Sequence, residues 1–164
     1  EEMQKEWFKK INNKYNYYFL IEHESKKIGL INCKDTNTER VAEGGIFIWD
    51  KAYWQTPIPA LASLTMLEAI FEEFKSGDTS VITVLKDNPA ALKFNQHIGY
   101  TIYYEDEKVY KLKLTLKDYF AKTYKLKKAA ALLVGKEKSK IEIIAEPSDL
   151  LDDKINTYLL SKKS

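Results

Sequence analysis

The stretch from residue 87 to residue 100, DNPAALKFNQHIGY, constrains the fold more than any other part of this chain. It follows a short apolar run over residues 81–85, of the kind that forms a buried strand. Asn88 is suited to cap a helix, and Pro89 fits the first helical position, where a missing amide hydrogen costs little. Gly99 supplies the left-handed residue that ends a helix, and apolar residues resume directly after it. The stretch therefore predicts a capped helix of about three turns between two strands.

The overall composition indicates a single globular domain. The 164 residues are 45% hydrophobic, enough for a core that needs neither a metal nor disulfides for stability. Lys and Arg number 26 against 24 Asp and Glu, so the net charge gives no reason to expect nucleic acid or another polyanion as a partner. The one cysteine, Cys33, cannot form an internal disulfide, and no apolar run approaches the roughly 18 residues of a membrane span. We therefore expect a cytoplasmic protein without a membrane partner.

Hydrophobic periodicity predicts an α/β fold with a mixed, mostly antiparallel sheet flanked by helices. The expected order is helix, three antiparallel strands, helix, strand, helix, two strands and helix. The corresponding residues are 1–12, 15–22, 27–33, 41–50, 60–74, 81–85, 89–98, 100–104, 109–116 and 117–133. Because a helix joins strands 41–50 and 81–85, these two are expected to be parallel neighbours through a right-handed crossover.

The domain organisation is expected to divide the chain at residue 133. Residues 1–133 form the main domain, and residues 134–164 form a C-terminal extension with a strand over 141–144 and a short helix over 147–160. The extension carries no motif with recognisable chemistry. It is expected to add an edge strand, to cover the sheet or to mediate a homodimer, and the sequence leaves these alternatives open.

The order of elements and three segments of sequence resemble the GNAT superfamily of N-acetyltransferases. The segments are residues 87–100, the run EWFKK at residues 6–10, and Tyr53 with Trp54. The last two are similar to the branch that includes ribosomal-protein N-terminal and sugar-nucleotide amine acetyltransferases. The first strand and first helix of the family are missing from residues 1–133, and are expected either upstream of Glu1 or replaced by the C-terminal extension.

The resemblance implies that acetyl-CoA is the cosubstrate. Its pantetheine arm would lie in a gap between strands 41–50 and 81–85, and its pyrophosphate at the start of the following helix, where free amides attract anions. The family pattern at that helix is Arg or Gln, two residues, Gly, one residue, then Gly or Ala. Gln55 and Ala60 match its ends, but Ile58 stands at the central glycine. The residues assigned to acetyl-CoA by the resemblance are Ile46, Phe47, Ile48, Gln55, Thr56, Ile58, Ala60, Asn88, Phe94 and Asn95.

Two prolines interrupt this helix start. Pro57 and Pro59 each remove an amide that would point at phosphate, so we expect a weakened pyrophosphate cradle in which Ile58 and Ala60 keep donors. Thr56 is expected to cap the helix. The alternative is that this segment is only a well-capped helix start, and that Asn88 is likewise only a cap.

Glu43 is the candidate general base, because it precedes Gly44 and Gly45 on the strand expected to line the gap. Its alternative is a solvated strand residue. The glycine pair predicts a bulge or a close approach to the backbone, with an amide there polarising the thioester carbonyl. Asn95 stands where the family often has a tyrosine that serves as general acid, and an amide cannot donate its proton at neutral pH. Nearby aromatic residues, namely Tyr100, Tyr103 and Tyr104, are expected to be packing residues.

These observations predict an N-acetyltransferase that moves an acetyl group from acetyl-CoA to a primary amine: an amino sugar, a protein N-terminus or a small amine. One alternative is a catalytically inactive GNAT-like domain that binds CoA or acts as a scaffold. A weaker alternative is a nucleic-acid-binding module, which only the basic helix supports, through residues Lys117, Lys122, Lys125, Lys127 and Lys128. The simpler expectation for these lysines is a solvated helix face. No metal is expected, because His23 and His97 are far apart and Cys33 is most simply a small core residue.

Overall fold

The computed structural model describes residues 2–11, 16–35, 40–75 and 77–133. Within them, a six-stranded mixed sheet has the order β1-β2-β3-β4-β6-β5. The strands are β1 (Asn16–His23), β2 (Lys26–Asp35), β3 (Val41–Ile48), β4 (Thr79–Leu85), β5 (Thr101–Glu105) and β6 (Val109–Thr115). The helices are α1 (Glu2–Ile11), α2 (Ile58–Glu68), α3 (Pro89–Ile98), α4 (Leu116–Asp118) and α5 (Tyr124–Leu133). The predicted C-terminal extension lies outside the described residues.

The predicted order and type of the elements are confirmed. The largest difference concerns the helix expected over residues 60–74: it begins at Ile58 and continues from α2 into a π-helical stretch, Ala69–Glu73. A second π-helical stretch, Tyr119–Thr123, joins α4 to α5. Hydrophobic spacing does not distinguish these stretches from α-helix, because each has 5 residues, about one turn, which is too short to show a period.

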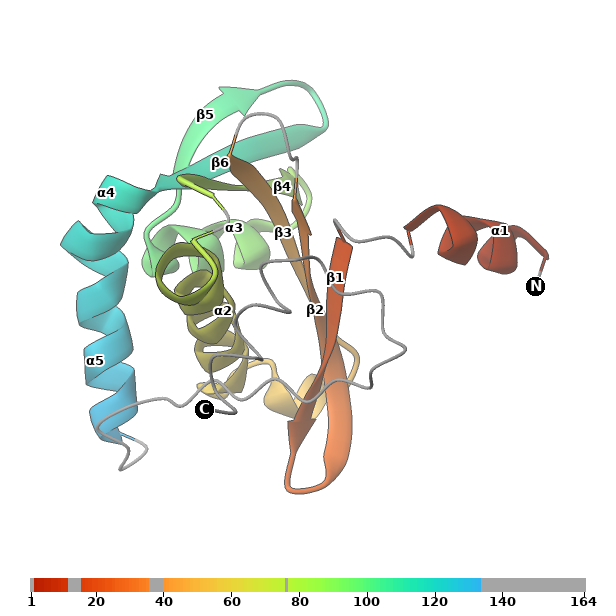
Figure 1. Cartoon of the computed structure of the whole chain (residues 1–164), viewed down its shortest axis with the longest axis horizontal. Coiled ribbons are helices and arrows are strands. Elements are labelled where there is room, and N and C mark those ends of the chain that lie inside the picture. Colours follow the sequence, from red (N-terminus) through yellow and green to blue (C-terminus); the bar gives the residue numbers. More distant parts are fainter. Residues whose placement is uncertain (1, 12–15, 36–39, 76, 134–164) are drawn as a thin grey trace.

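The sheet separates two unequal helical layers. Helices α2, α3 and α5 lie on one side of it and α1 lies on the other (Figure 1). All neighbouring strands are antiparallel except β3 and β4, which are parallel and joined through α2, as expected. The larger core cluster packs β4 and β6 against α2 and the helical segment that follows β6. The side of the sheet that carries α1 is called the open face below.

The capping signals around α3 are confirmed. The Asn88 side chain accepts a hydrogen bond from the amide of Ala91 at 3.0 Å, and Gly99 ends the helix with φ 124°. A Cβ on Gly99 would lie 2.7 Å from the hydroxyl oxygen of Thr123. That hydroxyl donates to the Ile98 carbonyl at 2.7 Å, so the end of α3 is fixed against the C-terminal helical segment.

The predicted solvated face of the basic helix is wrong at Lys127. Its side chain is 16% exposed and forms ion pairs with Glu68 at 2.5 Å and Glu72 at 3.5 Å, both on the helix that precedes β4. The buried Tyr119 hydroxyl donates a hydrogen bond to Glu72 as well. The C-terminal helical segment therefore holds α2 in place through charges as well as apolar contacts.

The predicted bulge at Gly44 and Gly45 is also wrong. The pairing of β2 with β3 runs without a register shift from Gly29–Ile48 to Asp35–Ala42. The other expectation for these glycines, a close approach to the backbone, holds at Gly45, where a Cβ would lie 2.7 Å from the side-chain oxygen of Asn32. Gly44 has more room, because the nearest atoms to such a Cβ are 3.8 Å away.

Candidate active site

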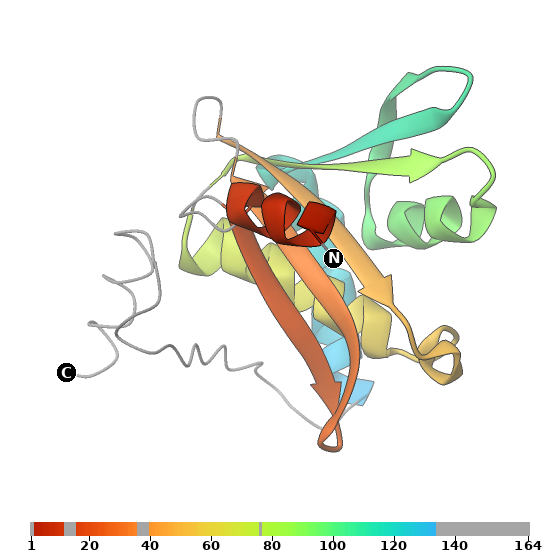
Figure 2. The same ribbon diagram turned by 90° about the vertical axis from the view of Figure 1, so that its right-hand side faces the viewer.

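Strands β3 and β4 separate after a short paired stretch. Their parallel pairing covers three residue pairs, from Val41 with Thr79 to Glu43 with Val81. Beyond them each strand stays fully paired on its outer side, β3 with β2 and β4 with β6. Figure 2 shows the two strands diverging toward their carboxyl ends. The predicted gap between strands 41–50 and 81–85 is therefore confirmed.

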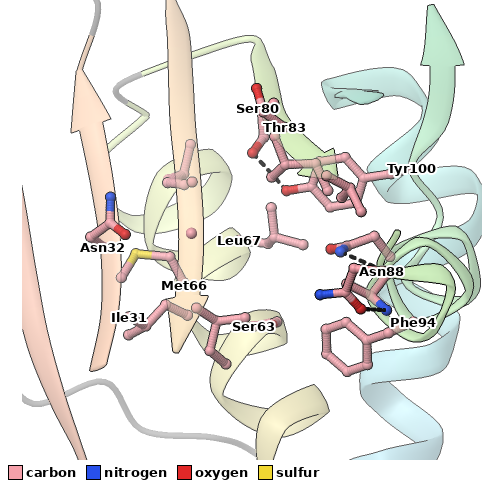
Figure 3. Close-up of a pocket in the computed structure, with 18 of the residues that line it drawn as sticks. Ile31, Asn32, Ser63, Met66, Leu67, Ser80, Thr83, Asn88, Phe94 and Tyr100 are labelled. Atoms are coloured by element: carbon pink, nitrogen blue, oxygen red, sulfur yellow. Dashed lines mark hydrogen bonds between the residues drawn. The ribbon is translucent and has the colours of Figure 1, made fainter. Parts of the chain in front are cut away.

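A cavity of about 310 Å³ occupies this gap. Its walls come from β2, β3, β4, α2 and α3, and Figure 3 shows their side chains converging on it. The cavity reaches both sides of the sheet, because its lining includes Met66 of α2 on the helical side and Asn32 and Thr83 on the open face. A molecule in the gap is therefore accessible to a second molecule that approaches from the open face.

Two hydroxyl groups meet in the cavity beside the paired end of the gap. Tyr100 and Ser80 are 6% and 1% exposed, and their hydroxyl oxygens lie 2.7 Å apart (Figure 3). The Ser80 oxygen is 4.0 Å from the position that a Cβ would take on Gly44. Burial raises the pKa of Tyr100 well above its usual range, and the hydrogen bond with Ser80 opposes part of that rise. The phenol therefore stays protonated at every physiological pH.

Tyr100 is the functional candidate that sequence reasoning missed. It was expected to be a packing residue, and it is buried, but its hydroxyl lies in the wall of the cavity. The available signal was its place directly after Gly99, where the chain turns from α3 back toward the sheet. The same expectation is wrong for Tyr103 and Tyr104, which are 48% and 46% exposed.

Glu43 lies at the paired end of the gap but outside the cavity lining. Strand alternation directs it to the open face, opposite to the buried Ala42. Its carboxylate is 3.9 Å from the ammonium of Lys34, and both side chains are 43% exposed. The base assignment stays a prediction, and the geometry restricts it to a molecule that arrives from the open face.

The α3 wall brings together three of the predicted cofactor residues. Asn88, Phe94 and Asn95 all line the cavity, together with Ile46 of β3. The Asn95 side-chain amide donates to the Ala91 carbonyl at 2.8 Å, so one of its two N–H donors is used within its own helix. The second N–H and the side-chain oxygen remain for a ligand.

Two predicted residues of β3 do not face the cavity with their side chains. Phe47 is 65% exposed on the open face, where its ring centroid is 6.4 Å from that of Trp49. Ile48 is buried in a second apolar cluster, and its carbonyl accepts a hydrogen bond from the Trp54 indole at 2.9 Å. Any contact of these two residues with an arm in the gap is therefore limited to their backbone.

The start of α2 lies outside the cavity lining and offers few amide donors. The Ile58 amide already donates to the Thr56 hydroxyl at 3.3 Å, and the Leu61 amide donates to the Pro57 carbonyl at 2.9 Å. The expectation that Ile58 keeps a free donor is therefore wrong, because the Thr56 hydroxyl accepts its hydrogen bond. The N-cap of α2 is Pro57, one residue later than the predicted cap at Thr56. Across residues 57–60 of the described chain, Ala60 keeps the one amide for which no acceptor is found. Gln55 is exposed beside this turn.

The described residues contain neither a metal-binding cluster nor a helix that could cross a membrane. Across residues 2–11, 16–35, 40–75 and 77–133, no group of three or more His, Cys, Asp or Glu side chains is placed to hold a metal ion. Over the same ranges, no helix has the length and apolar character that crossing a membrane requires.

The comparisons with known proteins agree with this geometry. The acetyltransferase (GNAT) domain family matches residues 1–101. The chain belongs to the GNAT acetyltransferase family. It is therefore an acetyltransferase, and the resemblance seen in its sequence and the GNAT fold are confirmed. No curated protein matched in a sequence search.

Two solved GNAT enzymes illustrate the similarity. The N-acetyltransferase PseH of Campylobacter jejuni shares 27% identity with a TM-score of 0.57, over 70% of this chain and 78% of PseH. PseH has also been solved in complex with acetyl coenzyme A. The spermidine N-acetyltransferase SpeG of Vibrio cholerae, solved as a point mutant, has a TM-score of 0.62 at 18% identity, over 72% of this chain and 76% of SpeG. At that identity the likeness to SpeG concerns the fold alone.

The proline-containing turn gives a prediction about anion binding. Pro59→Ala restores one amide at the start of α2, and we expect the Kd of the GNAT donor, acetyl-CoA, to fall by about tenfold. The reason is that a hydrogen bond to a charged group contributes about 1.5 kcal/mol. Calorimetric titration measures the change, and S-acetylpantetheine, which lacks the pyrophosphate, is the matched control ligand. An equal gain for both ligands, or none for acetyl-CoA, contradicts the assignment of this turn to pyrophosphate.

Proposed function

We propose that this chain transfers the acetyl group of acetyl-CoA to a primary amine, on an amino sugar, a protein N-terminus or a small amine. The observation that carries the proposal is the cavity between β3 and β4, with Gly44 and the hydroxyls of Ser80 and Tyr100 at the paired end of the gap. In this proposal residues 1–133 form the catalytic domain, and residues 134–164 are an extension to it.

The gap suits an extended acyl arm. From Gly44 onward the edge of β3 that faces β4 has no strand partner among the described residues, so its backbone groups are available to an amide-containing chain. The pantetheine arm carries two such amides and would pair with this edge as an added strand does. The acetyl group then lies near Gly44, where the missing side chain leaves space. PseH, which has been solved with acetyl coenzyme A, supports this choice of donor.

The two faces of the sheet give the reacting molecules separate routes. The donor arm lies in the gap, and the amine approaches from the open face past Glu43. Glu43 takes a proton from the ammonium group, directly or through water, and the free amine attacks the thioester carbon. The carbon–nitrogen bond forms, the carbon–sulfur bond breaks, and the sulfur leaves with the electron pair. Tyr100 donates a proton to that sulfur. The nitrogen loses its second proton as the amide forms, and that proton returns the Tyr100 phenolate to phenol through water. Proximity of the two substrates supplies much of the rate.

An amine acceptor is supported by the named activity of PseH. PseH is an N-acetyltransferase, so nitrogen is its acceptor atom. The same inference extends to this chain, whose route from the open face passes a carboxylate suited to deprotonating an ammonium group.

Filling the gap tests the donor site directly. Gly44→Val places two methyl groups where the arm would lie, and we expect acetyl-CoA binding to weaken by 100-fold or more, on the order of 3 kcal/mol. Gly44→Ala is the matched comparison: its Cβ finds no protein atom nearer than 3.8 Å, so it adds one carbon to the gap without crowding the protein and should weaken binding much less than Gly44→Val. Calorimetry measures affinity, and thermal unfolding checks that both variants are folded. A folded Gly44→Val protein that binds acetyl-CoA normally contradicts the proposal.

The base assignment is tested by Glu43→Gln. We expect kcat/KM for the amine to fall by about 100-fold near neutral pH, because general-base catalysis contributes on that order, with acetyl-CoA affinity retained. Acetylation is followed by release of free CoA thiol. Glu22→Gln, at the far end of β1, is the control and should retain activity. If Glu43→Gln acetylates at the wild-type rate at every pH, another group is the base.

The role of Tyr100 is tested by Tyr100→Phe. We expect kcat to fall by at least about tenfold while the KM for acetyl-CoA changes little, because the hydroxyl acts only as the thiolate leaves. Ser80→Ala is the comparison variant: it removes the hydrogen-bond partner but keeps the phenol, and should lower kcat less. Steady-state kinetics measures kcat for both variants. If both variants lose the same kcat, or if neither loses any, Tyr100 is not the proton donor.

A further inference from the structure

A row of cross-strand neighbours leads from the cavity across the open face. Thr83 lines the cavity and pairs with Lys111 of β6, which pairs in turn with Tyr104 of β5. Directly paired residues have Cβ atoms about 5 Å apart, so Lys111 lies one strand from the cavity rim and Tyr104 lies two. Lys113 is two residues along β6 and therefore shares this face with Lys111.

Two consecutive tyrosines contribute to this face because β5 is irregular. The register of β5 against β6 shifts between Ile102 and Tyr104, which leaves Tyr103 as the extra residue of a bulge. The ammonium of Lys111 lies 5.1 Å from the ring centroid of Tyr104, and that of Lys113 lies 5.6 Å from that of Tyr103. Two lysine–tyrosine pairs therefore stand side by side next to the cavity.

The positive charge of these lysines is not neutralised locally. Across the described part of the chain, no carboxylate lies within ion-pair distance of Lys111 or Lys113. The acidic side chains nearest in the sheet are engaged elsewhere, Glu43 with Lys34 and Glu105 with Lys86, each at 3.9 Å. The lysine–tyrosine face is therefore an exposed site of positive charge with two aromatic surfaces.

We propose that the lysine–tyrosine face, formed by Tyr103, Tyr104, Lys111 and Lys113, binds the phosphate group of an amine acceptor whose amine enters the cavity. This inference rests on the proposed function and specifies the class of its acceptor. Two ammonium groups match the double charge of a phosphate, and the tyrosine rings offer flat surfaces on which a sugar ring can pack. A polyamine is disfavoured, because its distal cationic groups would approach two lysines.

A matched pair of acceptors tests the proposal. Glucosamine and glucosamine 6-phosphate carry the same amine and differ in the phosphate, and spermidine serves as the cationic comparison. Each is titrated calorimetrically into the full chain saturated with CoA, and each is then assayed for acetylation with acetyl-CoA. We expect the phosphorylated sugar to bind about tenfold more tightly than glucosamine at low salt, and the difference to shrink as ionic strength rises. Spermidine should bind more weakly than either.

Variants assign the preference to particular side chains. Lys111→Gln/Lys113→Gln should abolish the preference for the phosphorylated sugar, while Lys117→Gln/Lys122→Gln, on the C-terminal helical segment, should retain it. Any of four results overturns the proposal. The two sugars bind equally, neither sugar binds at millimolar concentration, spermidine binds more tightly than the sugars, or the preference survives the Lys111/Lys113 change. Failure of the proposed function can be distinguished from failure of this phosphate-binding proposal, because in the first case CoA itself does not bind. The sugar titrations are then made on the free protein and judged by the same outcomes.

Discussion

The structure depends on the early end of the hydrogen bonding between β3 and β4. Three paired residues join the strands, and each then follows a different neighbour. Strand β4 is held by β6 along its full length, from Thr79 to Leu85, and its inward side chains belong to the larger core cluster. The end of β3 belongs to the second cluster, where Ile48 packs with Ile31 and with Ile58 at the start of α2. The core is thus divided along the line where the sheet opens, and Met66 packs against both halves.

Opening a sheet in this way is costly unless something satisfies the exposed groups. The hydroxyls of Ser80 and Tyr100 lie away from bulk water, and the backbone donors and acceptors of β3 beyond Glu43 have no partner on β4. The two hydroxyls satisfy each other, and an amide-containing arm would satisfy the backbone of β3. The gap therefore combines two properties of a binding site: apolar walls, and polar groups whose remaining bonds are left to a ligand.

Local signals predicted the elements well, and contacts distant in sequence decided the rest. Asn88 and Gly99 act on neighbouring residues, so the limits of α3 followed from the sequence. The parallel arrangement of β3 and β4 followed from the helix between them. Lys127 could not be placed, because its partners Glu68 and Glu72 lie more than 50 residues earlier and become neighbours only when α5 packs on α2. Tyr100 was missed for the same reason, since its hydroxyl partner is on β4.

The departures from the family pattern at the start of α2 all weaken the binding of a pyrophosphate. A helix start with two prolines and an occupied Ile58 amide has little to offer a pyrophosphate, so less of the donor's binding energy can come from that end. In the proposed arrangement, the remaining binding energy comes from the gap, close to the reacting thioester. Contacts there change as the tetrahedral intermediate forms, whereas contacts to a distant pyrophosphate stabilise ground state and transition state alike. A weak phosphate turn therefore raises the KM for the donor more than it lowers kcat, and an acetyltransferase of this design remains effective wherever acetyl-CoA is abundant.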